Sequence, residues 1–359
     1  MEVSPSAPSR RSVRAEKVAR RLPSAPRRLT RVTLVALYVA GVALLAGAIL
    51  EAVARTKNRF GYARSSSPRI VYELRPSYGD HSTTGRRDRE YSKTKPQGVL
   101  RVIGIGDSYS YGFGVPREKV FLKVAEEELN RRAARPVEVI NFGVPGYNTA
   151  MEAAVLEEVT PEWHPDLVVI QFCRNDLNLP NFIQTRTNVL FARSFALHLV
   201  LSRLARTWPT FVKKDLMGYG FDGEVFPVPG LEHVPMENDN PIGDPARTPP
   251  EYRYMVGRDG VRAALRAIRA ESRRRSLPVV LLLGWAGHDR DAARWAKAEG
   301  LAVADMWPAV QHRLAETRRG FESLWVAPPV DNHPNEEGHT IIGRLLAEKI
   351  LEQGLLAPR

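Results

Sequence analysis

Residues 99–115 read VLRVIGIGDSYSYGFGV, and this stretch decides which fold the chain adopts. A nearly continuous apolar run is typical of a strand buried on both faces of a sheet, and here it ends at Gly-Asp-Ser. The dinucleotide-binding fingerprint does not fit, because Tyr109 stands where its third glycine lets a helix pack closely. The nucleophile elbow G-x-S-x-G also fails, since Ser110 replaces its last glycine. The pattern leaves Ser108 as a candidate nucleophile at the C-terminal end of a strand.

Apolar runs alternate with helical patterns along the rest of the chain. Strands that are apolar throughout and alternate with helices predict a parallel sheet covered on both faces, which is a three-layer α/β/α architecture. The predicted strands cover residues 99–105, 137–142, 166–173, 278–284 and 301–305. The predicted helices cover residues 118–134, 148–159, 259–275, 288–299 and 336–353.

Residues 177–257 interrupt this alternation with a helical pattern followed by a stretch rich in Pro and Gly. The insertion follows the C-terminal end of a predicted strand, where parallel sheets place their ligand sites. Loops of this length in compact domains are functional or disordered. We interpret the insertion as a lid or substrate collar, with a flexible insertion as the alternative.

The N-terminal region differs from the rest in charge and hydropathy. Residues 1–31 hold nine Lys and Arg against two Glu, a large part of the net charge of +12, and their composition predicts a disordered cytoplasmic tail. Residues 32–50 are uncharged and apolar on all sides, which predicts a transmembrane signal-anchor helix over residues 32–54. A cleaved signal peptide is the alternative, because Ala52-Val53-Ala54 fits a cleavage site. The polar residues 55–98 are expected to be a linker or lead-in to the domain.

Positive charge sets the expected orientation of that anchor. Six Lys and Arg lie within about fifteen residues before the apolar segment and four lie after it. This bias predicts a single-pass protein whose catalytic domain lies outside the cytoplasm, on the periplasmic side in a bacterium. The basic tail is therefore assigned to a membrane context, and no nucleic-acid partner is expected. The sole cysteine, Cys173, excludes an internal disulfide and is expected to be a small buried strand residue.

A serine nucleophile needs a base, an oxyanion site and an orienting acid, and other strand ends supply candidates. The second predicted strand leads into NFGVPGYNT, where the N–H of Gly146 is placed to face an oxyanion. The third leads into CRND, where Asn175 offers a side-chain amide. Before the last helix comes VDNHPNEEGH, with His333 in a loop stiffened by Pro334.

With these four blocks in order, the chain resembles the SGNH/GDSL hydrolase family over residues 99–352, apart from the insertion. The resemblance implies the flavodoxin-like fold of that family for the domain and no cofactor or metal. It also implies that Ser108 is the nucleophile and His333 the general base. The oxyanion hole would then be formed by the N–H groups of Ser108 and Gly146 and by the side chain of Asn175.

The expected acid departs from the family pattern. The family spaces this Asp three residues before the histidine, but residue 330 is Val and Asp331 lies two residues before His333. In an extended loop, residues i and i+2 point the same way, so Asp331 is placed to reach the His333 ring. As an alternative, Asp331 caps the turn and a backbone carbonyl orients the histidine.

Several neighbouring polar residues are interpreted as structural. Asp107 and Asp176 are expected to brace their loops through hydrogen bonds, and His339 to be a structural histidine. Asn335 fits the N-cap of the last helix, since two glutamates follow it.

The sequence predicts a hydrolase domain over residues 99–359 that acts as a membrane-anchored serine esterase. Its substrate would be an acylated small molecule or glycan, with acetyl esters of cell-surface glycans as one case, and its membrane contact would be through residues 32–54. The first alternative is an O-acyltransferase that modifies an exported polysaccharide through the same acyl-enzyme. The second is a glycan-binding protein that keeps the fold without catalysis.

Overall fold

In the computed structural model of this protein, the described residues are 31–57, 61–180, 243–248, 250–283, 290–328 and 331–356, with residues 196, 220, 221, 224 and 225. The chain divides into two units, residues 1–50 and residues 51–359, and each is treated by itself. The predicted disordered tail and most of the predicted insertion lie outside the described residues.

Helix α1 (Arg31–Lys57) is the apolar N-terminal helix. Its part from Arg31 to Val53 is 23 residues long and contains an 18-residue window with a mean hydropathy of 2.4. At 1.5 Å per residue, such a helix is long enough to cross a hydrocarbon core of about 30 Å. Length and composition therefore fit a membrane span, and a signal sequence would meet the same two criteria.

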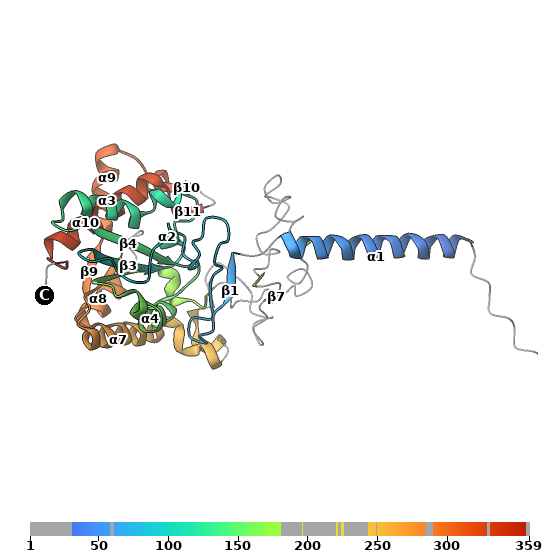
Figure 1. Ribbon diagram of the computed structural model, residues 1–359, viewed down its shortest axis with the longest axis horizontal. Helices are drawn as coiled ribbons and strands as arrows, with labels where there is room; N and C mark the ends of the chain where they lie inside the picture. The colour runs from blue at the N-terminus through green and yellow to red at the C-terminus, as the bar shows by residue number, and fades with distance from the viewer. Residues whose placement is uncertain are drawn as a thin grey trace, which may run out of the picture. The chain divides into compact units, whose positions relative to one another are not determined.

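Five parallel strands form the central sheet of the larger unit, in the order β4-β3-β5-β8-β9 (Figure 1). In chain order this is 2-1-3-4-5, the doubly wound flavodoxin-like arrangement that the sequence predicts. All five predicted strands are confirmed; the first four are buried for nearly their whole length, whereas the edge strand β9 has one buried residue, Ala304. Their bounds are β3 (Leu100–Gly106), β4 (Val137–Gly143), β5 (Leu167–Phe172), β8 (Val279–Leu283) and β9 (Ala302–Asp305).

Helices cover both faces of this sheet, which confirms the three layers (Figure 1). One face carries α3 (Phe121–Arg132), α9 (Trp307–Thr317) and α10 (Glu336–Glu352). The other carries α4 (Thr149–Glu158), α7 (Gly257–Arg275) and α8 (Arg290–Ala298). Asn335 caps α10 by accepting a hydrogen bond from the N–H of Gly338 (3.1 Å), as predicted.

Helix α9 is the one helix of the sheet layers that the sequence analysis missed. Its apolar face is narrow: Val310 is buried, while Trp307 and Leu314 are only partly buried against the core. These three residues follow the i, i+3, i+7 spacing of a helix, which is the signal that was available.

The remaining elements are short. The antiparallel pairs are β1 (Tyr62–Arg64) with β2 (Tyr72–Leu74), β6 (Gly220–Phe221) with β7 (Glu224–Val225), and β10 (Trp325–Ala327) with β11 (Asp331–Pro334). A single helical turn, α2 (Ser108–Tyr111), follows β3. 3₁₀ turns cover Arg117–Lys119, Thr160–Trp163, Arg174–Leu177, Pro245–Arg247, Pro250–Met255 and Phe321–Leu324.

The segment 61–98, expected to be a linker or lead-in, contributes to the core of the domain. Tyr72 and Leu74 are buried in the hydrophobic cluster beneath α4 and α7. Arg101 of β3 is also fully buried, and its guanidinium donates to the backbone carbonyls of Ser92 (2.9 Å) and Lys93 (2.8 Å). The segment is therefore anchored to the domain by both apolar and polar contacts.

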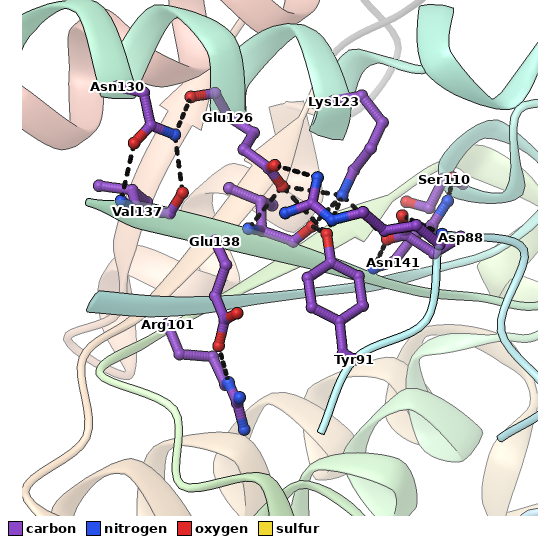
Figure 2. A network of polar contacts seen from close by, with 12 residues as sticks. Asp88, Tyr91, Arg101, Ser110, Lys123, Glu126, Asn130, Val137, Glu138 and Asn141 are labelled. Atoms are coloured by element: carbon purple, nitrogen blue, oxygen red, sulfur yellow. Dashed lines mark hydrogen bonds and ion pairs between the residues drawn. The ribbon is translucent and has the colours of Figure 1, made fainter. Parts of the chain in front are cut away.

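Figure 2 shows polar contacts that Asp88 and Tyr91 of this segment make with α3 and β4. Glu126 of α3 accepts hydrogen bonds from Arg89 (2.6 Å), Tyr91 (3.2 Å) and Lys123 (2.9 Å). Asp88 is buried and accepts from the backbone N–H of Asn141 on β4 (2.9 Å). Buried charges need such partners, and Asp88 and Glu126 have them where this polar stretch packs on the domain.

Candidate active site

Ser108 begins the helical turn α2 directly after β3. The turn is tightly packed against the sheet, since a Cβ at Gly106 would lie 2.3 Å from the Ser110 hydroxyl oxygen. Ser110 in turn is buried and donates to Gln171 of β5 (3.1 Å). Glycine at position 106 is therefore required for the close approach that fixes the backbone of Ser108.

His333 and Asp331 lie on β11, which pairs with β10. The Nε2 atom of His333 lies 2.8 Å from the Ser108 Oγ atom, although 225 residues separate them. The Nδ1 atom of His333 lies 2.6 Å from Asp331 Oδ1, and the same oxygen accepts the backbone N–H of His333 (3.0 Å). The extended backbone of β11 places both side chains on one side, so the i, i+2 spacing brings Asp331 to the ring.

Asn175 lies in the 3₁₀ turn after β5, and its side chain is exposed. Its amide Nδ2 donates one hydrogen bond to Asp107 Oδ2 (2.9 Å). Asp107 is fully buried and also accepts the backbone N–H of Tyr109 (2.9 Å). Asp107 therefore links the loops that follow β3 and β5, which confirms its interpretation as a brace.

Gly146 lies in the turn after β4, where it adopts a φ of 81°. The strands β3 and β4 end in register at Gly106 and Gly143, so this turn leaves the sheet beside Ser108. Tyr72 holds the turn from the segment 61–98: its hydroxyl donates to the carbonyl of Pro145 (3.0 Å), and its own carbonyl accepts from the Tyr147 hydroxyl.

All four predicted blocks thus meet at the carboxyl edge of the sheet. Ser108, His333 and Asp331 are joined by hydrogen bonds, and Asn175 is joined to Asp107, the residue next to Ser108. Gly146 reaches the same edge from the neighbouring strand β4. The sequence analysis did not assign Tyr72, which supports the Gly146 turn. No periodic pattern points to this residue, because its strand β2 is only three residues long.

Buried acids lie behind the candidate nucleophile. Asp176 accepts from the hydroxyl of Thr149 (2.7 Å), which ties α4 to the turn after β5 and confirms Asp176 as a brace. Glu152 of α4 is fully buried, and neither carboxyl oxygen has a hydrogen-bond partner among the described residues. Burial and the neighbouring carboxyl groups raise the pKa of both Glu152 and Asp176 well above the usual range.

Among the described residues, one group has the spacing of a metal site: the ligand atoms of Asp107, Cys173 and Asp176 lie within 4.8 Å of one another. Its chemistry does not fit a metal. All three residues are buried, and their oxygen and sulfur atoms already make hydrogen bonds within the protein. Burial raises the pKa of the Cys173 thiol well above its usual value, which opposes the thiolate that a metal requires.

His339 is structural, as expected. It is fully buried in α10, where its Nδ1 atom accepts the backbone N–H of Phe121 (3.2 Å) and its ring stacks on the Phe121 ring. Burial lowers the pKa of His339 to about 3, so the ring is neutral at physiological pH.

A pocket of about 280 Å³ lies at the carboxyl edge of the sheet, beside the turn that carries Asn175. It is lined by Phe172, Arg174, Leu177, Arg258, Asp291, Ala292 and Trp295. A larger pocket of about 590 Å³ lies at the opposite edge, where its lining includes Leu100, Asp166 and Pro278 at the amino ends of three strands. Of these two pockets, which described residues line, the smaller one shares an edge with Ser108.

The model of the GDSL-like lipase/acylhydrolase family matches residues 105–341, about two thirds of the 359 residues. No curated protein matches the sequence significantly.

Solved structures with a similar fold include three hydrolases. The lipase/acylhydrolase from Enterococcus faecalis is 17% identical, with coverage of 72% of this chain and 98% of that chain and a TM-score of 0.40. An acetylxylan esterase from Geobacillus stearothermophilus is 15% identical, with coverage of 70% and 94% and a TM-score of 0.39. An alpha/beta hydrolase from the metagenome of Lake Arreo, Spain, is 15% identical, with coverage of 72% and 97% and a TM-score of 0.38. The family model, which matches most of the domain, confirms the resemblance seen in the sequence: this chain belongs to the GDSL-like lipase/acylhydrolase family of ester-hydrolysing serine hydrolases.

Proposed function

We propose that this esterase uses Ser108 as nucleophile, His333 as general base and Asp331 as the acid that orients the histidine. The observation that carries the proposal is the continuous chain of contacts from Ser108 Oγ to His333 Nε2 (2.8 Å) and from His333 Nδ1 to Asp331 Oδ1 (2.6 Å). The carboxylate favours the tautomer with hydrogen on Nδ1, so the Nε2 lone pair faces the serine hydroxyl.

In the first step, His333 takes the proton of Ser108 while the serine oxygen attacks the carbonyl carbon of the ester. The N–H groups of Ser108 and Gly146 and the side-chain amide of Asn175 stabilise the resulting oxyanion. The bond to the alcohol oxygen then breaks, and His333 delivers its proton to that oxygen. Water, activated by His333, releases the acid from Ser108 and restores the enzyme.

The support for the Asn175 role is its orientation. The amide carries two hydrogens, and one of them donates to the buried Asp107 (2.9 Å). A side chain fixed in this way keeps its second N–H aimed without reorganisation when charge develops, which is the condition for effective oxyanion stabilisation.

The substrate we propose is an acyl ester outside the cytoplasm, with acetylated cell-surface glycans as the leading class. The support is the N-terminal apolar helix together with the excess of Lys and Arg before it, a charge bias that favours a catalytic domain on the outer side of a membrane. An enzyme held there by α1 meets glycans and lipids of the cell envelope as its nearest esters.

The test uses the full chain in detergent with 4-nitrophenyl acetate, butyrate and octanoate. Ser108→Ala is expected to lower hydrolysis by at least 10³-fold, whereas Ser92→Ala, an exposed serine outside the site, retains wild-type activity. A fluorophosphonate probe should label the wild-type chain but neither Ser108→Ala nor His333→Ala. Full activity in Ser108→Ala would show that the assignment is wrong. Slow hydrolysis that a sugar acceptor accelerates would instead identify an acyltransferase.

A further inference from the structure

The loop after α2, residues 112–115, is held tightly beside the nucleophile. The backbone N–H of Phe113 donates to the carbonyl of Ser108 (3.1 Å). Gly112 and Gly114 have φ values of 80° and 84°, which favour glycine. A Cβ at Gly112 would also lie 2.1 Å from Val120. The two glycines therefore fix the backbone on both sides of Phe113.

Arg87, from the segment 61–98, holds this loop from the other side. Its Nη1 atom donates to the carbonyls of Tyr111 (2.9 Å) and Gly112 (2.8 Å), and its Nη2 atom donates to the carbonyl of Val115 (2.8 Å). Its Nε atom pairs with Asp80 (2.7 Å), and the side chain is only 11% exposed. A planar guanidinium with this many fixed bonds leaves the loop little freedom.

This rigid support holds the Phe113 ring partly exposed to solvent. The Phe113 side chain is 47% exposed. Apart from α1, the only other large apolar side chains exposed among the described residues are Tyr78 and Tyr254. The Phe113 ring centroid lies 5.1 Å from that of His333, with the planes tilted by 39°. Tyr109 contacts the same imidazole edge-on, with centroids 5.2 Å apart.

Because Phe113 lies beside His333, it is placed to contact the alcohol half of the ester and not the acyl half. His333 must deliver its proton to the leaving alcohol oxygen, so that oxygen lies within about 3 Å of Nε2 when the ester bond breaks. The group attached to this oxygen then continues past the imidazole, whereas the acyl group stays on Ser108. An aromatic ring whose centroid lies 5.1 Å from the His333 ring is within stacking range of that group.

We propose that Phe113 is a specificity-determining residue that binds the alcohol half of the ester, and that this alcohol is a ring with an apolar face. Two sources share that chemistry, a pyranose of a glycan and an aryl alcohol. The inference rests on the proposed function, because it uses the proton transfer from His333. The bond from the acyl carbon to the alcohol oxygen breaks, the bond to Ser108 Oγ forms, and the alcohol leaves over Phe113 with the proton that His333 took from Ser108.

The experiment compares acetate esters that differ only in the alcohol: ethyl acetate, phenyl acetate and a methyl xylopyranoside with one acetyl group. In the full chain, Phe113→Ala should lower kcat/KM for the matching ring ester by about 3- to 10-fold, the range of one lost ring contact, and for ethyl acetate by less than 2-fold. Phe113→Trp should keep kcat/KM for the matching ring ester near the wild-type value, because an aromatic ring is again present. The ring ester with the larger loss identifies the source, pyranose or aryl. Tyr78→Ala, which removes another exposed aromatic side chain, is the matched control and should change neither value.

Two further readouts separate this proposal from a structural effect and from failure of the proposed function. The rate of deacylation should not change in Phe113→Ala, because the alcohol has already left. Fluorophosphonate labelling of Ser108 in the wild-type chain tests the proposed function, and its absence would overturn both proposals. Normal labelling with equal losses for ethyl and ring esters, or with no loss for either ring ester, would overturn the Phe113 assignment alone.

Discussion

Asp331 offers the sharpest test of the proposed mechanism, because its spacing departs from the family pattern. Its Oδ1 atom accepts two hydrogen bonds from His333, one from the ring (2.6 Å) and one from the backbone N–H (3.0 Å). In Asp331→Asn, the backbone N–H holds the amide oxygen at the same place, since the amide NH₂ cannot accept that bond. The histidine tautomer is therefore retained, and only the charge is lost.

The expected loss follows from that difference. Replacing a charged acceptor by a neutral one weakens a hydrogen bond by about 1 kcal/mol. A full Coulomb contact near a protein surface is worth roughly 4 kcal/mol. Between these two limits, Asp331→Asn is expected to lower kcat by about 10²-fold, which corresponds to an increase of roughly 2.7 kcal/mol in the activation free energy. Asp331→Ala also loses the orientation of the ring, and a loss of about 10³- to 10⁴-fold is expected.

The assay is kcat for 4-nitrophenyl acetate hydrolysis by the two variants and the wild-type chain, with circular dichroism as the control for folding. The kcat of Asp331→Asn should be higher than that of Asp331→Ala. If it were equal or lower, the backbone N–H of His333 would not hold the amide oxygen in place. If both variants stayed within about 3-fold of wild type, Asp331 would only cap the turn, and the Ser-His pair would act without it.

Two other predictions follow from the same edge of the sheet. Asn175→Ala should lower kcat for 4-nitrophenyl acetate by about 10²- to 10³-fold in a chain that circular dichroism shows to be folded, and an unchanged kcat would remove Asn175 from the oxyanion site. Glu152→Gln should change the pH dependence of stability, measured as the urea midpoint at pH 5 and pH 8. The folded state raises the pKa of Glu152, so between the unfolded and folded pKa values wild-type stability falls as pH rises, by about 1.4 kcal/mol per pH unit. Glutamine does not titrate, so the variant should gain stability relative to wild type at pH 8 compared with pH 5; an equal difference at both pH values would show that Glu152 is ionised when folded.

Local patterns were enough to predict the sheet and the two principal candidate residues. The five strands are mostly apolar because helices cover both faces of a parallel sheet, and each strand shows this pattern in its own residues. Ser108 and His333 stand out because they follow a strand end and precede a helix. The N-cap Asn335 is readable for the same reason, since its contact is with a residue three positions away.

Contacts between distant segments were not readable in this way. Arg87 and Tyr72 lie in a polar stretch, and nothing local shows that Arg87 supports the Phe113 loop or that Tyr72 supports the Gly146 turn. The expectation of a linker or lead-in rested on polarity, and polarity alone does not distinguish a solvated charge from one paired inside the fold.

The sequence by itself determined the strands of the central sheet, all its covering helices except α9, the apolar N-terminal helix and the identities of the candidate nucleophile and base. Only the tertiary structure decided whether Asp331 reaches His333, since the i, i+2 contact depends on the extended backbone that β11 adopts beside β10. It also decided that Phe113 lies exposed beside His333, because Arg87 and two glycines hold its loop there. The spacing of apolar residues along a chain indicates which face of a helix or strand packs on the core. A site depends instead on contacts between residues that are far apart in the sequence.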